Sequence, residues 1–201
     1  MSDSVVLFID YQNTYRAARA VYHERLDHHV HGQINPRRLG DLILTKSAAP
    51  RKLKEVRIYR GLPSSKHDSK GYAAARSQIA TWDRDPLVRP IWRPLRYPED
   101  WPNSPEEEKG IDVQMAVDYV MGAVKGDFDV GILMSLDTDM KPALETVRDT
   151  FGGRVKTEVA AWNTPQRHCR KLSVKGVWCH WLQPEDYAAV QDLHDYNTGA
   201  P

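Results

Sequence analysis

The chain has 201 residues, of which 28 are basic and 27 acidic, so its formal net charge is only +1. This length fits one domain with a sizeable core. The near balance of charge excludes a general electrostatic attraction to nucleic acid or membranes, so any basic patch has to be local. No segment has the apolar character of a signal peptide or the length of a membrane span. Cys169 and Cys179 match no zinc or redox spacing, so we expect reduced thiols and a cytoplasmic protein.

Strands and helices are predicted to alternate along the chain. We expect strands over residues 4–9, 56–59, 88–93, 129–134, 155–160 and 177–182. We expect helices over residues 13–25, 36–46, 66–82, 110–125, 140–151 and 165–172, with one more in the tail from Pro184. Pro90 favours an edge position for its strand. The alternation predicts an α/β fold, a three-layer α/β/α sandwich with a mostly parallel central sheet. We expect one domain over residues 1–183, followed by a C-terminal tail over 184–201.

Two apolar runs end in acidic residues. Residues 5–9 run directly into Asp10, and residues 130–134 are followed shortly by Asp137 and Asp139. Ligand sites of open α/β sheets lie outside the carboxyl ends of such strands. Several carboxylates meeting there repel one another unless a cation lies among them. The pattern therefore predicts a site for Mg²⁺ or Mn²⁺, which prefer oxygen ligands.

Asp112 is predicted to lie on the buried side of a helix. At 100° per residue, Gln114, Asp118 and Lys125 fall on one stripe of helix 110–125, which we expect to be the solvated face. Asp112 points almost opposite, and a buried carboxylate requires compensation. Helix capping is the alternative explanation for Asp112, and equally for each of the other aspartates taken alone. The set as a whole favours a metal role.

Four polar residues near these aspartates are candidates for supporting roles. Asn13 offers a neutral oxygen ligand or a hydrogen bond, and Ser135 and Thr138 could orient ligands or an attacking water. Lys109 could contact a phosphate oxygen, or it could be an ordinary exposed lysine. The loop over residues 94–108 holds four prolines and the acidic run 106–108, and we expect it to be exposed and partly mobile.

Basic residues follow strand ends or occupy nearby helices, and they predict a local rim that binds RNA phosphates. A solvated face of mixed charge is the alternative. The residues of this rim are Arg16, Arg19, Arg60, Lys66, Lys70 and Arg76.

The triplet His28, His29 and His31 resembles a metal cluster, but we expect no metal there. Adjacent histidines in a loop are not expected to aim at one ion, and no cysteine or carboxylate stands at a zinc spacing.

Three segments of the chain resemble the NYN family, a branch of the PIN-like metal-dependent nucleases that includes the LabA-like proteins of bacteria. Their order and spacing match over roughly residues 4 to 182. The resemblance implies a PIN-like α/β/α fold and cleavage of RNA with Mg²⁺ or Mn²⁺. It assigns the acidic site to Asp10, Asp112, Asp137 and Asp139, with Asn13 beside it, and Asp118 matches a further acidic position often seen in the family. The segments are Phe8-Ile9-Asp10-Tyr11-Gln12-Asn13, Lys109-Gly110-Ile111-Asp112-Val113 with its helix to Asp118, and Ser135-Leu136-Asp137-Thr138-Asp139-Met140-Lys141-Pro142.

The chain departs from the family at Tyr11 and Leu136, where glycine is usual, and bulk at Leu136 could narrow the metal pocket. The expected function is a metal-dependent ribonuclease in which one or two ions held by the four aspartates activate a water. The alternative is a non-catalytic module that binds RNA or a protein and keeps the acidic pocket. A phosphatase of the haloacid-dehalogenase type is disfavoured because Gln12 stands where that chemistry needs a second aspartate. Homo-oligomerisation stays open, and no membrane partner is expected.

Overall fold

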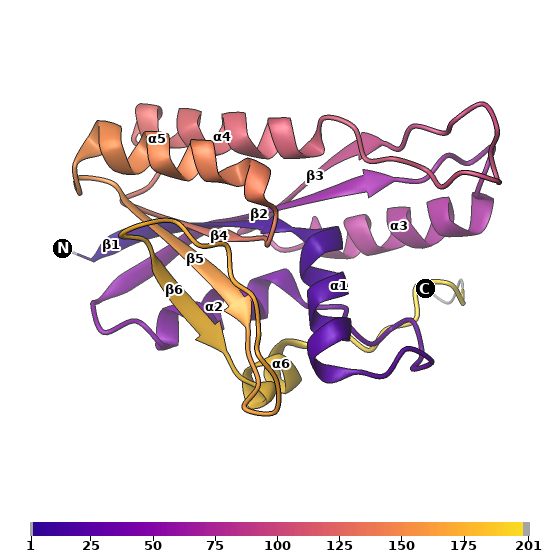
Figure 1. Cartoon of the computed structure of the whole chain (residues 1–201), viewed down its shortest axis with the longest axis horizontal. Coiled ribbons are helices and arrows are strands. Elements are labelled where there is room, and N and C mark those ends of the chain that lie inside the picture. Colours follow the sequence, from indigo (N-terminus) through magenta and orange to yellow (C-terminus); the bar gives the residue numbers. More distant parts are fainter. Residues whose placement is uncertain (1, 199–201) are drawn as a thin grey trace.

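The computed structural model describes residues 2–198 and contains one six-stranded sheet whose five pairings are all parallel (Figure 1). The strand order is β3-β2-β1-β4-β5-β6. The strands are β1 (Asp3–Asp10), β2 (Arg51–Leu62), β3 (Val88–Pro94), β4 (Val130–Met134), β5 (Lys156–Trp162) and β6 (Trp178–Leu182). The helices are α1 (Tyr11–Tyr22), α2 (Pro36–Thr45), α3 (Ser69–Trp82), α4 (Ile111–Lys125), the short 3₁₀ helix η1 (Thr138–Met140), α5 (Lys141–Phe151) and α6 (Pro184–Val190).

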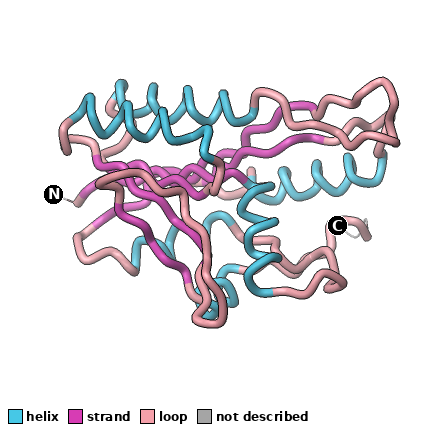
Figure 2. Tube along the Cα trace, in the orientation of Figure 1, coloured by secondary structure: helices cyan, strands magenta, loops and turns pink. Residues whose placement is uncertain are grey.

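Helices cover both faces of the sheet, which confirms the predicted three-layer sandwich. Helices α4 and α5 lie on one face, and α1, α2, α3 and α6 lie on the other (Figures 1 and 2). The central strand β1 sends Val5, Leu7 and Ile9 into one core and Val6 and Phe8 into the other. Because both of its faces are buried, this strand is apolar without alternation.

The chain reverses its direction of travel across the sheet at β1. Strands β2 and β3 extend the sheet on one side of β1, and β4, β5 and β6 extend it on the other. The carboxyl ends of β1 and β4 therefore flank the topological switch point, where open α/β sheets form their ligand crevice. Asp10 ends β1, and Asp137 follows β4 by three residues.

The expected helix over residues 165–172 is wrong, because this segment forms turns and irregular chain. Leu172 and Val174 are both buried in the core on the α4–α5 side. Two residues of the same face at a spacing of two fit extended chain rather than a helix. The tail expected from residue 184 begins with α6, whose Tyr187 and Val190 are buried in the other core. This first part of the tail thus packs as part of the domain.

The predicted solvated stripe of α4 is wrong for two of its three residues. Gln114 and Asp118 are half-buried, and Asp118 accepts a hydrogen bond from the Tyr59 hydroxyl at 2.9 Å. The most exposed apolar residues of the helix are instead Val113 and Val124, with exposed fractions of 66% and 58%. The inward stripe of the helix is apolar, and the hydrogen bond to Tyr59 of β2 accompanies the partial burial of Asp118 beside it. None of the described helices is both long and apolar enough to cross a membrane.

Candidate metal centre

Asp10 is buried at the carboxyl end of β1, with an exposed fraction of 6%. One of its carboxylate oxygens caps α1 by accepting from the Asn13 amide at 3.0 Å, and the other accepts from the Ser135 hydroxyl at 2.9 Å. Burial is the main cause that raises the pKa of Asp10 to about 7, and the nearby charges of Glu108 and Asp112 add smaller contributions. The hydrogen bonds from Asn13 and Ser135 lower the pKa, but burial outweighs them. The protein thus holds a carboxylate where its own charge is disfavoured.

Ser135 ties the loop after β4 to the end of β1. Its buried hydroxyl donates to Asp10 and accepts from the Asp137 amide at 3.1 Å. Asn13 makes a parallel link, because its side-chain oxygen accepts from the Leu136 amide at 2.8 Å. These bonds fix the two acidic strand ends relative to each other, and they use the Asn13 oxygen as a structural acceptor.

Asp137 and Asp139 lie at the start of η1. Asp137 is the N-cap of this helix and accepts from the Asp139 amide at 2.9 Å. Its side chain is half-buried and lines a cleft that it shares with Asp10, whereas Asp139 is exposed and does not line this cleft. Asp10 and Asp137 therefore do cap helices, as the alternative explanation for the aspartates predicted. An ionised carboxylate keeps further lone pairs for a cation.

Asp112 reaches the same cleft from the first turn of α4. The helix begins after Gly110, which has a left-handed backbone with φ of 76° and offers no side-chain cap. Burial raises the pKa of Asp112, and the charges of Asp137, Glu108 and Asp139 raise it further, in that order. Carboxylates from different segments thus oppose one another's ionisation across the cleft.

Glu108 is a fourth cleft carboxylate that the sequence analysis missed. It belongs to the loop that was expected to be exposed and partly mobile. Two backbone hydrogen bonds of 2.9 Å pair Arg96 with Glu107, so the two ends of this loop lie side by side. Glu108 then accepts from the Gly61 amide near the end of β2 at 2.8 Å. Its position directly before Lys109-Gly110-Ile111-Asp112 was the one available signal.

The donor set of this cleft fits a divalent cation. Within residues 2–198, none of the ion pairs involves the four lining carboxylates or Asp139. Among the described residues that line the cleft, the basic ones are Arg16 and Arg170. No three of these carboxylates in the described chain lie within 4.8 Å of one another. Mg²⁺ usually keeps several waters and takes only one or two carboxylates as direct ligands, so it does not require three carboxylates in contact.

Three further candidates lie outside the lining of the cleft. Thr138 and Lys109 are exposed, and the Lys109 ammonium lies 4.0 Å from Glu107. Asp118 bonds to Tyr59 and to Gln114, each at 2.9 Å.

Of the two departures from the family pattern, Leu136 lines the cleft, whereas Tyr11 is buried in the core and accepts a hydrogen bond from the side-chain amide of Gln78 at 2.9 Å.

The structure does not bring the residues of the predicted basic rim together at the cleft, since Arg16 is the one member of this set that lines it. Arg19 donates to the carbonyl oxygens of Asp27, His28 and His31 at 2.8–2.9 Å. Arg60 donates to Gln78 and Gly61 and lies over the Tyr11 ring. The exposed residues of this set outside the cleft are Lys66, Lys70 and Arg76, of which Arg76 lies over the Trp92 ring at 5.6 Å. Arg170, which the sequence analysis missed, stands in the segment expected to be a helix.

An open parallel α/β sandwich with an acidic cleft at its switch point defines a class of proteins suited to binding a cation and an anionic substrate. The NYN domain model matches residues 4–173, so the chain belongs to the NYN domain family, which is part of a nuclease superfamily whose members generally depend on divalent metals. A search of curated proteins finds no match. A crystal structure of a protein of unknown function from Vibrio parahaemolyticus is similar, with a TM-score of 0.59, 18% identity, and coverage of 92% of this chain and 95% of that one. This similarity shows the fold.

Proposed function

We propose that the protein is a ribonuclease that hydrolyses RNA phosphodiester bonds with Mg²⁺ or Mn²⁺. Membership of a nuclease-like family supports the reaction class. The observation that carries the proposal is the cleft at the switch point, where carboxylates from four separate segments face one space and none makes an ion pair among the described residues. Both cysteines are free and buried, which agrees with the expected cytoplasmic location.

The residues that would hold the cation are Asp10, Asp112 and Asp137, with Glu108 and Asp139 nearby to bind its waters. A bound divalent ion supplies a water of lowered pKa and neutralises charge on the phosphoryl oxygens. No serine, cysteine or histidine nucleophile is required for this chemistry.

The rest of the cleft positions these groups and the RNA. Ser135 holds Asp10 and the Asp137 loop in one arrangement. Arg16 and Arg170 face the cleft and are placed to contact phosphates beside the scissile bond. Leu136 also lines the cleft, where its side chain occupies space beside the carboxylates.

The test is cleavage of a fluorescently labelled single-stranded RNA in Mn²⁺, with EDTA as the metal-free arm. We expect Asp10→Asn and Asp137→Asn to abolish cleavage while thermal unfolding shows an intact fold. Asp83→Asn is the matched control, because Asp83 is exposed at the end of α3 and does not line the cleft. Undiminished cleavage by both cleft variants would refute the assignment.

The second candidate is a module that binds RNA or protein without turnover. It is favoured by the capping bonds of Asp10 and Asp137 and by the side chain of Leu136 in the cleft. RNA binding that persists without product in Mg²⁺ and Mn²⁺, for the wild type as for Asp10→Asn, would establish this alternative.

A further inference from the structure

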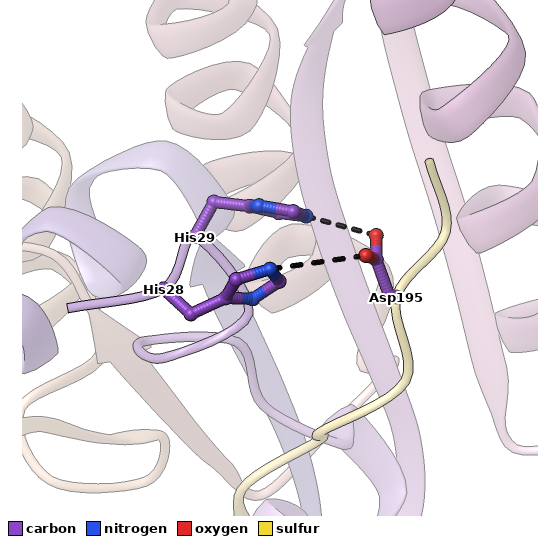
Figure 3. Close-up of side chains that lie close together, drawn as sticks. All are labelled: His28, His29 and Asp195. Atoms are coloured by element: carbon purple, nitrogen blue, oxygen red, sulfur yellow. Dashed lines mark hydrogen bonds and ion pairs between the residues drawn. The ribbon is translucent and has the colours of Figure 1, made fainter. Parts of the chain in front are cut away.

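We propose that His28, His29 and Asp195 form a second metal site, for a transition-metal cation such as Zn²⁺, separate from the acidic cleft. Figure 3 shows both imidazole rings directed at the same carboxylate. The Nε2 atom of His29 lies 2.9 Å from one oxygen of Asp195, and the Nε2 atom of His28 lies 4.0 Å from the other. This is the one group of three metal-ligating side chains within residues 2–198 whose donor atoms all lie within 4.8 Å of one another.

The donor types and their spacing fit a tetrahedral cation. Zinc binds imidazole nitrogen and carboxylate oxygen at 2.0–2.2 Å, which places neighbouring ligand atoms about 3.3 Å apart. The two separations from the imidazole nitrogens to Asp195 lie on either side of this value, and all three donor atoms lie within 4.8 Å of one another. Two imidazoles and one carboxylate select zinc or a related ion over Mg²⁺, which prefers oxygen. Water would take the fourth position.

The adjacency of the two histidines does not prevent them from sharing a ligand. Their rings are inclined at 37° with centroids 4.2 Å apart, so both Nε2 atoms reach one side of the loop. The expectation that adjacent histidines in a loop do not aim at one point is therefore wrong for His28 and His29. It holds for His31, whose ring stacks on His23 at 4.6 Å instead. The missing carboxylate comes from Asp195, more than 160 residues along the chain.

The loop that carries the histidines is held by α1. The Arg19 guanidinium donates to the carbonyl of His28 at 2.8 Å and also to those of Asp27 and His31. The Tyr15 hydroxyl donates to the carbonyl of His29 at 2.9 Å. Because the backbone at both histidines is already fixed, only side-chain freedom is lost when a cation binds.

The carboxylate is held in a similar way. The backbone amide of Asn197 donates a hydrogen bond to one carboxylate oxygen of Asp195 at 2.9 Å, which fixes the orientation of this side chain. The tail that carries Asp195 is in turn hydrogen-bonded to the loop between α1 and α2, because the Asp192 amide donates to the Gln33 carbonyl at 3.0 Å. Bonds of this kind orient metal ligands in known sites.

The His29 Nε2 atom has more polar neighbours than it can satisfy. It lies 2.9 Å from Asp195 and 2.7 Å from the side-chain nitrogen of Asn197. A ring nitrogen either donates or accepts one hydrogen bond, so it cannot serve both at once. A cation at this point would bind the ring nitrogen and the carboxylate together, and would clamp the C-terminal tail to the loop after α1.

The test is calorimetric titration of the full chain with ZnCl₂ in excess MgCl₂, which occupies oxygen-ligand sites. We expect one zinc equivalent to bind the wild type and to be lost in the double variant His28→Ala/His29→Ala. Asp195→Asn, which keeps the side-chain shape, should bind at least tenfold more weakly. His67→Ala is the matched control, because His67 is exposed and belongs to no such group.

A second readout is independent of RNA cleavage. Zinc should raise the unfolding temperature of the wild type and of His67→Ala but not that of the double variant, whose metal-free unfolding temperature reports its folding. Equal zinc binding by the wild type and the double variant, or an equal loss in His67→Ala, would overturn the proposal. Either result leaves the acidic cleft and the proposed nuclease function untouched.

Discussion

Burial raises the pKa of Asp10 to about 7 in the folded protein, compared with 3.8 for an unperturbed aspartate. Between these two pH values the folded state binds more protons at this group than the unfolded state does. Stability of the metal-free protein therefore falls as pH rises from about 4 to about 7, and the full cost is present above pH 7. A cation in the cleft would remove much of this cost by favouring the charged form.

The first prediction follows for Asp10→Asn, which keeps a good N-cap residue for α1. In EDTA at pH 8 we expect the variant to be more stable than the wild type by roughly 1–3 kcal/mol, since it removes a buried charge. The gain should vanish near pH 4, where the wild-type carboxyl is protonated. Urea unfolding at both pH values measures this, and a variant less stable than the wild type at pH 8 would contradict it.

The second prediction concerns Ser135, which bonds to Asp10 and to the Asp137 amide. We expect Ser135→Ala to lower kcat about 10- to 100-fold with little change in KM, because it loosens metal ligands without touching the RNA. Steady-state cleavage in Mn²⁺ measures both constants. Ser77→Ala, on the exposed face of α3, is the control and should behave as the wild type. An unchanged kcat in Ser135→Ala would remove Ser135 from the positioning role.

At the scale of elements, an ion network joins β2, β5 and β6 at a distance from the cleft. Arg51 binds both oxygens of Glu158 at 2.6 and 2.7 Å, and His180 binds one of them at 2.6 Å. All three side chains are less than 10% exposed. Burial by itself raises the pKa of Glu158, but the bonds from His180 and Arg51 outweigh it and hold the pKa at about 2.

The third prediction is that Arg51→Met destabilises the protein by about 3–5 kcal/mol, because it leaves the buried carboxylate of Glu158 without its arginine partner. In the wild type, the stability contributed by Glu158 should be present above about pH 4.5 and be lost as pH falls toward 2, since its folded pKa is depressed. Chemical denaturation as a function of pH measures both effects. Arg38→Met, at an exposed position on α2, is the control. A loss below 1 kcal/mol in Arg51→Met would show that the network contributes little.

At the scale of the whole molecule, the net charge of +1 provides almost no attraction for RNA, so binding depends on where the charges lie. The acidic cleft repels RNA phosphates unless a cation is present, and Arg16 and Arg170 are the cations that line it. Affinity should therefore require both the metal and these two side chains.

The fourth prediction is that Arg170→Ala weakens binding of single-stranded RNA about equally for different sequences and reduces the slope of log K against log salt by roughly 0.7. Fluorescence anisotropy over a range of KCl concentrations, in Ca²⁺ to prevent turnover, measures the slope. Arg76→Ala is the control, because Arg76 lies over Trp92 away from the cleft. An equal effect of both variants would place the RNA elsewhere.

The sequence by itself determined the order of strands and helices, the edge position of β3 and the aspartates at the strand ends. Each of these depends on local information. Buried strands appear in the sequence as continuous apolar runs, and helices appear as apolar residues with a helical period. In a parallel sheet, all carboxyl ends of the strands lie on one side. The same local information failed for the helix expected over residues 165–172 and for the solvated stripe expected on α4.

Only the tertiary structure decided which side chains share a space. It brought Glu108 into the cleft through the pairing of Arg96 with Glu107, directed Arg19 to loop carbonyls and placed Asp195 beside His28 and His29. It also showed that Asp10 and Asp137 cap helices while facing the cleft. These outcomes depend on contacts between segments far apart in the chain, whose free energy is set by packing and burial and leaves no periodic trace in the sequence.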